Sequence, residues 1–313
     1  MKKVMIISLY ITTGIVIIVA GAIWYAIYHI LPYSSIKPYR VTQEKLNWKF
    51  PPYNSDSIRA VAPHHFTFTT RDSVVLDAWF VRSALAQPPK GTVIILHGIA
   101  SCKEMMLGAI LQFTKLGYNV VAYDSRANGA SGGEYCTLGY YEKYDVGDCI
   151  TALEKEFKVT GSFAVYGASM GGAIAMQALA VEPRISCGIV MSTFATLRET
   201  TYDYMEQIIG IRWQWIGKPV MEKSEQIARF SIDDVAPEKY AKRVRQSVLV
   251  VHGDADEKIS VQYGQRLYNA LASEDKQLEV VRGAGHFNLD AVGGEHLQQK
   301  VAQWMDSHMD TAR

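Results

Sequence analysis

The chain has 313 residues, of which 49% are hydrophobic and 20% charged, and its net charge is +1. These values are ordinary for a globular protein with one large domain or two small ones. Neither the near-neutral charge nor any run of basic residues among aromatic ones indicates a nucleic-acid partner.

The N-terminus carries a long apolar segment. Residues 4–31 contain no charged side chain and are interrupted only by His29. A helix of about 20 apolar residues crosses the hydrocarbon core of a bilayer, so we predict a single transmembrane anchor over residues 1–31. Aromatic residues that favour the headgroup level crowd its far end: Trp24, Tyr25, Tyr28 and Tyr33.

Two alternatives concern this segment. The small residues at 20–22 offer a signal-peptide cleavage site, but the apolar stretch continues beyond them, which favours an uncleaved signal anchor. The basic residues on the two flanks give opposite indications of membrane topology. Lys2 and Lys3 precede the segment and favour a cytoplasmic N-terminus, but four basic residues follow it. The Lys-Lys start leads us to expect the body of the chain on the extracytoplasmic side. The four basic residues are Lys37, Arg40, Lys45 and Lys49.

Residues 32–62 contain four prolines and predict an extended tether. From residue 63 onward, short apolar runs alternate with amphipathic stretches of helical length, the pattern of a mostly parallel sheet covered by helices. A turn at Arg71-Asp72 predicts an antiparallel hairpin at the sheet edge. The predicted strands are 65–69, 74–81, 92–97, 119–123, 162–166, 188–192, 247–252 and 277–281, and the predicted helices are 103–116, 140–157, 170–180, 261–272 and 295–307.

The four cysteines show neither CxxC pairing nor a metal-ligand spacing with histidine. We expect them to be small buried hydrophobic residues, because a domain of this size buries its own core without a disulfide framework. A single Cys102–Cys136 bond remains open if the domain faces an oxidising compartment. No metal or other cofactor is predicted.

The segment 162–172 combines an apolar strand with the sequence Gly-Ala-Ser-Met-Gly-Gly, in which the serine is Ser169. G-x-S-x-G between a strand and a helix is typical of a nucleophile elbow. The turn strains the serine backbone, and glycines at 167 and 171 remove the side chains that would clash. We therefore predict Ser169 to be a nucleophile at a helix N-terminus, where developing negative charge is stabilised.

A stretch rich in Tyr, Trp, Met and Ile lies at about 194–233 and does not fit the alternation of strands and helices. One interpretation is a further helix that covers the core. We favour a small helical cap whose apolar inner face roofs the site, because the insert is longer than a single crossover needs. The residues concerned are Tyr202, Tyr204, Met205, Ile208, Ile209, Ile211, Trp213, Trp215 and Ile216.

Two later segments supply a base and an acid for Ser169. The apolar run 248–251 leads to Asp254 and Asp256, and the last predicted strand leads to the glycine-flanked His286. Catalytic groups gather at the carboxyl ends of parallel strands. We predict that His286 takes the serine proton and that one of the two carboxylates orients its imidazole.

An acyl-transfer site also needs two backbone N–H groups that point at the developing oxyanion. We expect one from Met170, which follows the nucleophile, and one from Ile99, in the loop after the run that ends in His97-Gly98. His97 itself suits a structural hydrogen bond at a strand end.

Over about residues 64–310 these segments resemble the α/β-hydrolase superfamily. The loop 124–133 is similar to the D-x-R-G-x-G-x-S-x-G loop of the branch with serine-aminopeptidase-like, monoacylglycerol-lipase-like and acyl-protein-thioesterase-like enzymes. The resemblance implies an α/β-hydrolase fold with an eight-stranded sheet. It also implies that Asp256 is the acid, with Asp254 in reserve, and that Asp124 and Arg126 shape their loop.

Two departures narrow the resemblance. The residues after His97-Gly98 are Ile99-Ala100, which differs from the HGGG loop of hormone-sensitive-lipase-like esterases. Dehalogenases and epoxide hydrolases have this fold but carry an aspartate where this chain has Ser169.

We therefore predict a membrane-anchored serine hydrolase that acts on a small-molecule or lipid-like acyl substrate, an ester, thioester or small amide, through an acyl-enzyme. The alternatives are a peptidase of the serine-aminopeptidase type and a non-catalytic binding protein on the same fold. The substrate itself does not follow from fold-level analogy.

Overall fold

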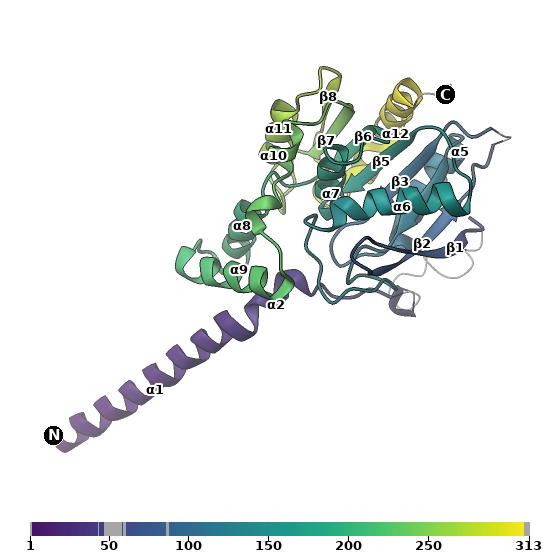
Figure 1. Ribbon diagram of the computed structural model, residues 1–313. Helices are drawn as coiled ribbons and strands as arrows, with labels where there is room; N and C mark the ends of the chain where they lie inside the picture. The colour runs from purple at the N-terminus through teal and green to yellow at the C-terminus, as the bar shows by residue number, and fades with distance from the viewer. Residues whose placement is uncertain (1, 43, 47–57, 59–60, 86–87, 310–313) are drawn as a thin grey trace.

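The computed structural model describes residues 2–42, 44–46, 58, 61–85 and 88–309. One eight-stranded sheet forms its centre, with the strand order β1-β2-β4-β3-β5-β6-β7-β8 (Figure 1). The strands confirm all eight that the sequence predicts, with bounds that differ by a few residues. They are β1 His64–Thr69, β2 Val75–Val81, β3 Thr92–Leu96, β4 Asn119–Tyr123, β5 Phe163–Ala168, β6 Ile185–Met191, β7 Ser247–Gly253 and β8 Lys276–Val281.

The sheet is antiparallel at one edge and parallel elsewhere. β1 pairs with β2 as the predicted hairpin, and β2 pairs antiparallel with β4. From β4 to β8 every neighbouring pair is parallel. Since parallel strands end at the same edge, the loops after β3, β5, β7 and β8 come together there.

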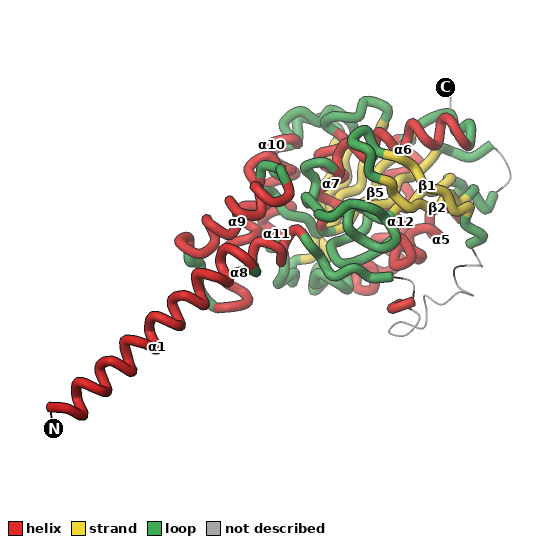
Figure 2. Tube along the Cα trace, turned by 60° about the horizontal axis from the view of Figure 1, so that its bottom comes forward, coloured by secondary structure: helices red, strands yellow, loops and turns green. Residues whose placement is uncertain are grey.

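Helices cover both faces of the sheet, so the central strands are apolar on both sides. In β3 all five residues are buried, and alternate side chains enter different cores: Ile94 packs on one face and Ile95 on the other. Helices α6, α7 and α11 contribute to the first core, and α5 and α12 to the second. Figure 2 shows the strands enclosed by helices. The bounds are α5 Leu107–Lys115, preceded by the short η2 Lys103–Met106, α6 Glu142–Glu156, α7 Met170–Leu179, α11 Val261–Ala270 and α12 Leu289–His308.

Two helical features were not predicted. The short helix α10, Pro237–Ala241, packs on α7 and α11. Helix α12 begins six residues before the predicted start at 295 and is interrupted at Gly294, whose φ is 51°. The amphipathic pattern identifies the part after that glycine, because the helical register changes there.

The predicted cap segment folds into two helices, α8 Leu197–Ile209 and α9 Gln214–Ala228, followed by the short η3 Ile232–Asp234. The Thr196 hydroxyl accepts a hydrogen bond from the Glu199 amide at the start of α8. Gly210, with a φ of 72°, ends the same helix in the left-handed conformation that glycine adopts without strain. Local capping therefore defines both ends of α8.

The N-terminal helix α1, Lys2–His29, leaves the rest of the molecule (Figure 1). Its apolar window has a mean hydropathy of 2.4 and is not covered by other described residues. By length and composition it has the character of a membrane span or a signal sequence.

An extended tether over 32–62 is not what the structure shows at its beginning. Residues Leu31–Ile36 form a further helix, α2, which packs on α9, and Ile36 is completely buried in the main core. The docked helix buries the apolar side chains of Pro32 and Ile36, which an extended tether would leave in water. This burial stabilises α2. Residues 43, 47–57 and 59–60 of the predicted tether lie outside the described residues.

All four cysteines, Cys102, Cys136, Cys149 and Cys187, are buried and free. The open Cys102–Cys136 pairing is therefore not formed, and the expectation of buried hydrophobic residues is confirmed.

Candidate active site

Ser169 lies between β5 and α7 with φ 55° and ψ −121°. Residues other than glycine rarely adopt this backbone conformation. The tight turn explains the two glycines of the motif. A Cβ on Gly167 would lie 2.2 Å from the Gly171 carbonyl oxygen, and one on Gly171 would lie 2.0 Å from that of Leu96. The strain is held by close packing of β5, α7 and β3, and it lifts the hydroxyl clear of the sheet.

The structure brings three of the predicted site residues into one hydrogen-bonded chain. His286 Nε2 lies 3.1 Å from Ser169 Oγ, and His286 Nδ1 lies 2.8 Å from Asp256 Oδ2. The three side chains come from the ends of β5, β7 and β8, which are separated by long stretches of sequence. This geometry allows the imidazole to accept the hydroxyl proton while the carboxylate accepts from Nδ1–H.

The Asp256 carboxylate is buried and well supplied with donors. Its Oδ1 accepts from the amides of Lys258 and Ile259, each at 2.9 Å. Burial alone would raise the pKa of Asp256, but the nearby His252 ring and the hydrogen bonds from His286 and the Ile259 amide outweigh it and hold that pKa below the usual range. The carboxylate is therefore ionised at neutral pH and ready to stabilise an imidazolium.

Asp254, the reserve candidate for the acid, has a different position. It is exposed, and its Oδ1 accepts a hydrogen bond from the Gly283 amide at 2.6 Å. That contact fixes the start of the loop that carries His286. In the same loop the Asn288 side chain accepts from the Gly285 amide at 2.7 Å. Asp254 thus binds the backbone of the loop that carries His286, whereas Asp256 binds the imidazole.

The loop after β3 borders Ser169, as expected for an oxyanion hole. A Cβ on Gly98 would lie 3.6 Å from Ser169 Cβ, which places the next residue, Ile99, beside the nucleophile. Met170 is the first residue of α7, so its N–H is one of those at the helix N-terminus that lack an intrahelical partner. The structure therefore brings Gly98, which precedes Ile99, and Met170 to the serine, and the two oxyanion donors stay a prediction.

His97 is structural, as the sequence predicts. It is completely buried, its Nε2 accepts from the Ser125 amide at 2.9 Å, and its Nδ1 donates to the Gly98 carbonyl at 2.7 Å. Burial lowers the pKa of His97, which keeps the ring neutral as this pair of contacts requires.

The loop 124–133 has the shaping role that the resemblance implies. Asp124 accepts from both the amide and the Nζ of Lys103, at 2.7 and 2.8 Å, and so ties this loop to the chain that follows Ile99. Arg126 forms ion pairs with Asp72 and Asp145, each with a contact of about 2.6 Å or shorter. Neither side chain reaches the serine; both hold the loops around it.

The large apolar and aromatic residues of the predicted cap divide into two sets. Tyr202, Tyr204, Met205 and Ile216 are half-buried, and burial together with the nearby Asp256 charge raises the pKa of Tyr204. The other five are exposed, and an apolar inner face that roofs the site stays a prediction. The exposed residues are Ile208, Ile209, Ile211, Trp213 and Trp215.

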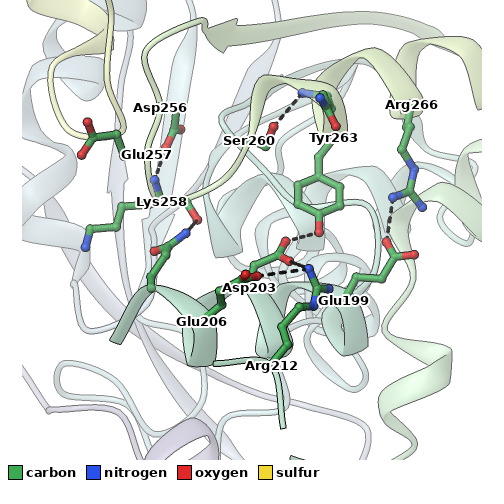
Figure 3. A pocket seen from close by; sticks show the side chains of 12 residues that line it. Glu199, Asp203, Glu206, Arg212, Asp256, Glu257, Lys258, Ser260, Tyr263 and Arg266 are labelled. Carbon is green, nitrogen blue, oxygen red and sulfur yellow. Dashed lines mark hydrogen bonds and ion pairs between the residues drawn. The ribbon is translucent and has the colours of Figure 1, made fainter. Parts of the chain in front are cut away.

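A polar cavity of about 540 Å³ lies between α8 and α11 (Figure 3). Asp256 lines it, but Ser169 and His286 do not. Ion pairs form its wall: Arg266 binds Glu199 at 2.7 Å, and Arg212 binds Asp203 at 2.8 Å. No local sequence pattern indicates this cavity, because its charges come from segments that meet only in the folded chain. Its charged wall does not suit an acyl chain.

Among the residues that the structure describes, no group of three or more His, Cys, Asp or Glu side chains is placed to hold a metal ion. The chemistry that the arrangement can perform with its own groups is nucleophilic attack by serine with histidine as the base.

Comparison with known proteins finds chains of similar sequence and fold. A sequence model described as serine aminopeptidase, S33, matches residues 87–229, which include the elbow and the loop 124–133. The chain is 24% identical to an uncharacterized protein, YqkD, of Bacillus subtilis, over 79% of this chain and 85% of that protein. It is also 24% identical to a monoacylglycerol lipase of Mycolicibacterium smegmatis, over 79% of this chain and 97% of the lipase.

Among solved structures, the Pyrococcus furiosus esterase Pf2001 is similar, with a TM-score of 0.71 and 26% identity. The alignment covers 89% of this chain and all of the esterase chain. A Pyrococcus horikoshii acylaminoacyl peptidase shares the fold at a TM-score of 0.58 and 19% identity, but this chain spans only 41% of its length.

Proposed function

This chain belongs to the α/β-hydrolase superfamily, and we propose that it is a serine hydrolase that cleaves an ester, thioester or small amide through an acyl-enzyme on Ser169. The observation that carries the proposal is the position of His286, whose two ring nitrogens lie within hydrogen-bonding distance of Ser169 and Asp256. A histidine with only a structural role would not need a strained serine at one nitrogen and a buried carboxylate at the other.

In this mechanism the Ser169 oxygen attacks the substrate carbonyl and forms a bond to its carbon while His286 Nε2 takes the hydroxyl proton. The carbonyl electron pair moves to oxygen, where the N–H groups of Met170 and Ile99 stabilise the charge. His286 then gives its proton to the leaving alcohol, thiol or amine as the acyl bond breaks. Water, deprotonated by the same histidine, releases the acid and restores the serine.

The similarity to a lipase and an esterase favours an acyl substrate of lipid-like character. Anchoring through α1 is part of the proposal, since an enzyme held at a bilayer meets such a substrate at high local concentration. The first arm of the substrate test is therefore a series of p-nitrophenyl esters of increasing acyl length, assayed with the full-length protein in detergent.

A peptidase of the serine-aminopeptidase type is the second candidate, and the family match over residues 87–229 is the observation that favours it. Acidic side chains near Asp256 do exist, but Asp203 and Glu199 already form ion pairs with arginines. Aminoacyl p-nitroanilides, assayed beside the esters, separate the two candidates: faster turnover of the anilides would favour the peptidase.

Labelling with a fluorophosphonate separates a catalyst from a binding protein on the same fold. We expect wild-type protein to be labelled on Ser169, and Ser169→Ala to lose the label while it remains folded by circular dichroism. A serine with an exposed hydroxyl, such as Ser34, is the matched control, and Ser34→Ala should keep full labelling. Failure of folded wild-type protein to react would contradict the proposal.

A further inference from the structure

The turn that joins α8 to α9 exposes a set of large apolar side chains, which we call the cap tip: Ile208, Ile209, Ile211, Trp213 and Trp215. Ile208 is 78% exposed and Trp215 is 60% exposed. The two tryptophan rings stack on each other with centroids 5.3 Å apart. Contiguous apolar patches of this kind on a soluble surface mark a contact with another phase or protein.

The cap tip is attached to the membrane-proximal end of the chain. Helix α9 packs on both α1 and α2, and the Ser224 hydroxyl of α9 donates to the Pro32 carbonyl at 2.9 Å. Ile27 is buried although most of α1 is exposed. In both views the α8–α9 turn lies at the end of the molecule from which α1 projects (Figures 1 and 2).

The length of α1 sets the level of this contact relative to a bilayer. About 20 residues cross the hydrocarbon core, so a span that begins near Val4 ends near Ile23. The next residues, Trp24 and Tyr25, are exposed aromatic side chains of the type that occupies the headgroup region. The buried Ile27 lies one turn further on, and the cap helices therefore dock on α1 at the headgroup level.

The aromatic character of the cap tip fits a lipid surface. Arg212 pairs with Asp203 and Lys218 pairs with Glu222, so these two charges are balanced within the cap. The exposed tryptophan rings are of the type that favours the headgroup level of a bilayer. A surface for a second protein would not require exposed tryptophans beside a membrane helix.

We propose that the cap tip inserts into the interface of the same bilayer in which α1 is anchored, so that the cap is held against the lipid surface. This rests on the anchoring that is part of the proposed function. The cap borders the site through α8, where Gln207 donates to the Lys258 carbonyl, two residues after Asp256.

The test uses full-length protein in vesicles of phosphatidylcholine with phosphatidylglycerol, with a spin label at one introduced cysteine. The four native thiols are buried, which keeps background labelling low. Trp215→Cys probes the cap tip, Val16→Cys probes the middle of α1, and Val75→Cys is the control. Val75 is exposed, like Val16, but lies at the start of β2, away from α1. Accessibility to oxygen, which partitions into lipid, is compared with accessibility to a water-soluble nickel chelate.

We expect positions 16 and 215 to favour oxygen and position 75 to favour the chelate. A lipid-exposed position 16 with a water-exposed position 215 would overturn the cap insertion and leave the anchor intact. Protection of position 215 from both reagents would show a protein partner, such as a second copy, and would also overturn it. A water-exposed position 16 would remove the anchor and the cap insertion together, whereas ester hydrolysis by the same samples reports separately on the serine mechanism.

Discussion

The hydrolase body and the end of the molecule that carries α1 and the cap tip differ in how their apolar side chains are covered. In the body, strands such as β3 are buried on both faces, and the polar groups of the site have partners. At the other end, α1 and the cap tip expose their large apolar residues. The body covers its apolar side chains as a protein in water does, while the other end suits the apolar phase that the proposed anchor would enter.

One chain thus combines a covered body with an end whose apolar side chains are exposed. The body needs only its own residues to place Ser169, His286 and Asp256. In the proposed function the exposed end supplies location and substrate, so its loss should alter what the enzyme reaches and not the chemistry it performs.

The largest effect should follow from changes to the catalytic chain in the body. We expect Ser169→Ala and His286→Ala each to lower ester turnover by about four to six orders of magnitude, because either change removes nucleophilic catalysis as a unit. Steady-state assays on a soluble p-nitrophenyl ester measure this, with thermal unfolding as the control for folding. Turnover near the wild-type rate in either variant would contradict the assignment.

The two neighbouring carboxylates should differ strongly. Asp256→Asn should lower kcat by about 10⁴-fold with little change in KM, because the amide leaves His286 in the wrong tautomer. Asp254→Asn should cost far less, since it weakens only a bond to the Gly283 amide. The pair is its own matched control. Equal losses would show that the acid has not been identified.

The buried ion pairs of Lys103 support the loop after β3, and their loss should lower the stability of the fold. Lys103 is buried, with its Nζ 2.6 Å from Asp77 and 2.8 Å from Asp124, so Lys103→Met leaves buried carboxylates without a cation. We expect the free energy of unfolding to fall by about 3–5 kcal/mol, as for other broken buried pairs. Denaturant titration measures this free energy, and Lys90→Met, at a half-buried surface ion pair, should change it by less than about 1 kcal/mol. A loss no larger than that of the control would mean that the network is dispensable.

The smallest effect on chemistry should follow from removal of residues 1–30, which leaves α2 whole. We expect the truncated protein to hydrolyse a soluble short-chain ester at nearly the full rate, because every proposed catalytic group lies in the body. Hydrolysis of a bilayer-resident ester should fall further, since the local concentration at the surface is lost. The measured quantity is the ratio of the two rates. A folded truncated protein without activity on the soluble ester would place α1 in the catalytic structure.

Much of the body could be predicted from the sequence because its signals are local. Buried parallel strands read as continuous apolar runs, and glycine is required at 167 and 171 because a Cβ there would lie 2.2 and 2.0 Å from a backbone oxygen. The structure also separates Asp256 from Asp254, which the spacing alone left open.

The end that carries α1, α2 and the cap tip was predicted less accurately, because its structure depends on tertiary contacts. The helix α2 forms where prolines indicated an extended tether, since Ile36 is buried only when α2 docks. The direction of the cap tip depends on the same docking. The ion pairs of Arg266 and Arg212 join segments that no local pattern connects.

The most direct test of the central claim is to trap the acyl-enzyme. Full-length protein is mixed rapidly with p-nitrophenyl acetate, quenched in acid within one turnover, and digested for mass spectrometry. We expect a burst of p-nitrophenol, stoichiometric with enzyme, and an acetyl group on the peptide that contains Ser169. Steady hydrolysis without an acetylated Ser169 peptide, or an acetyl group on another residue, would contradict it.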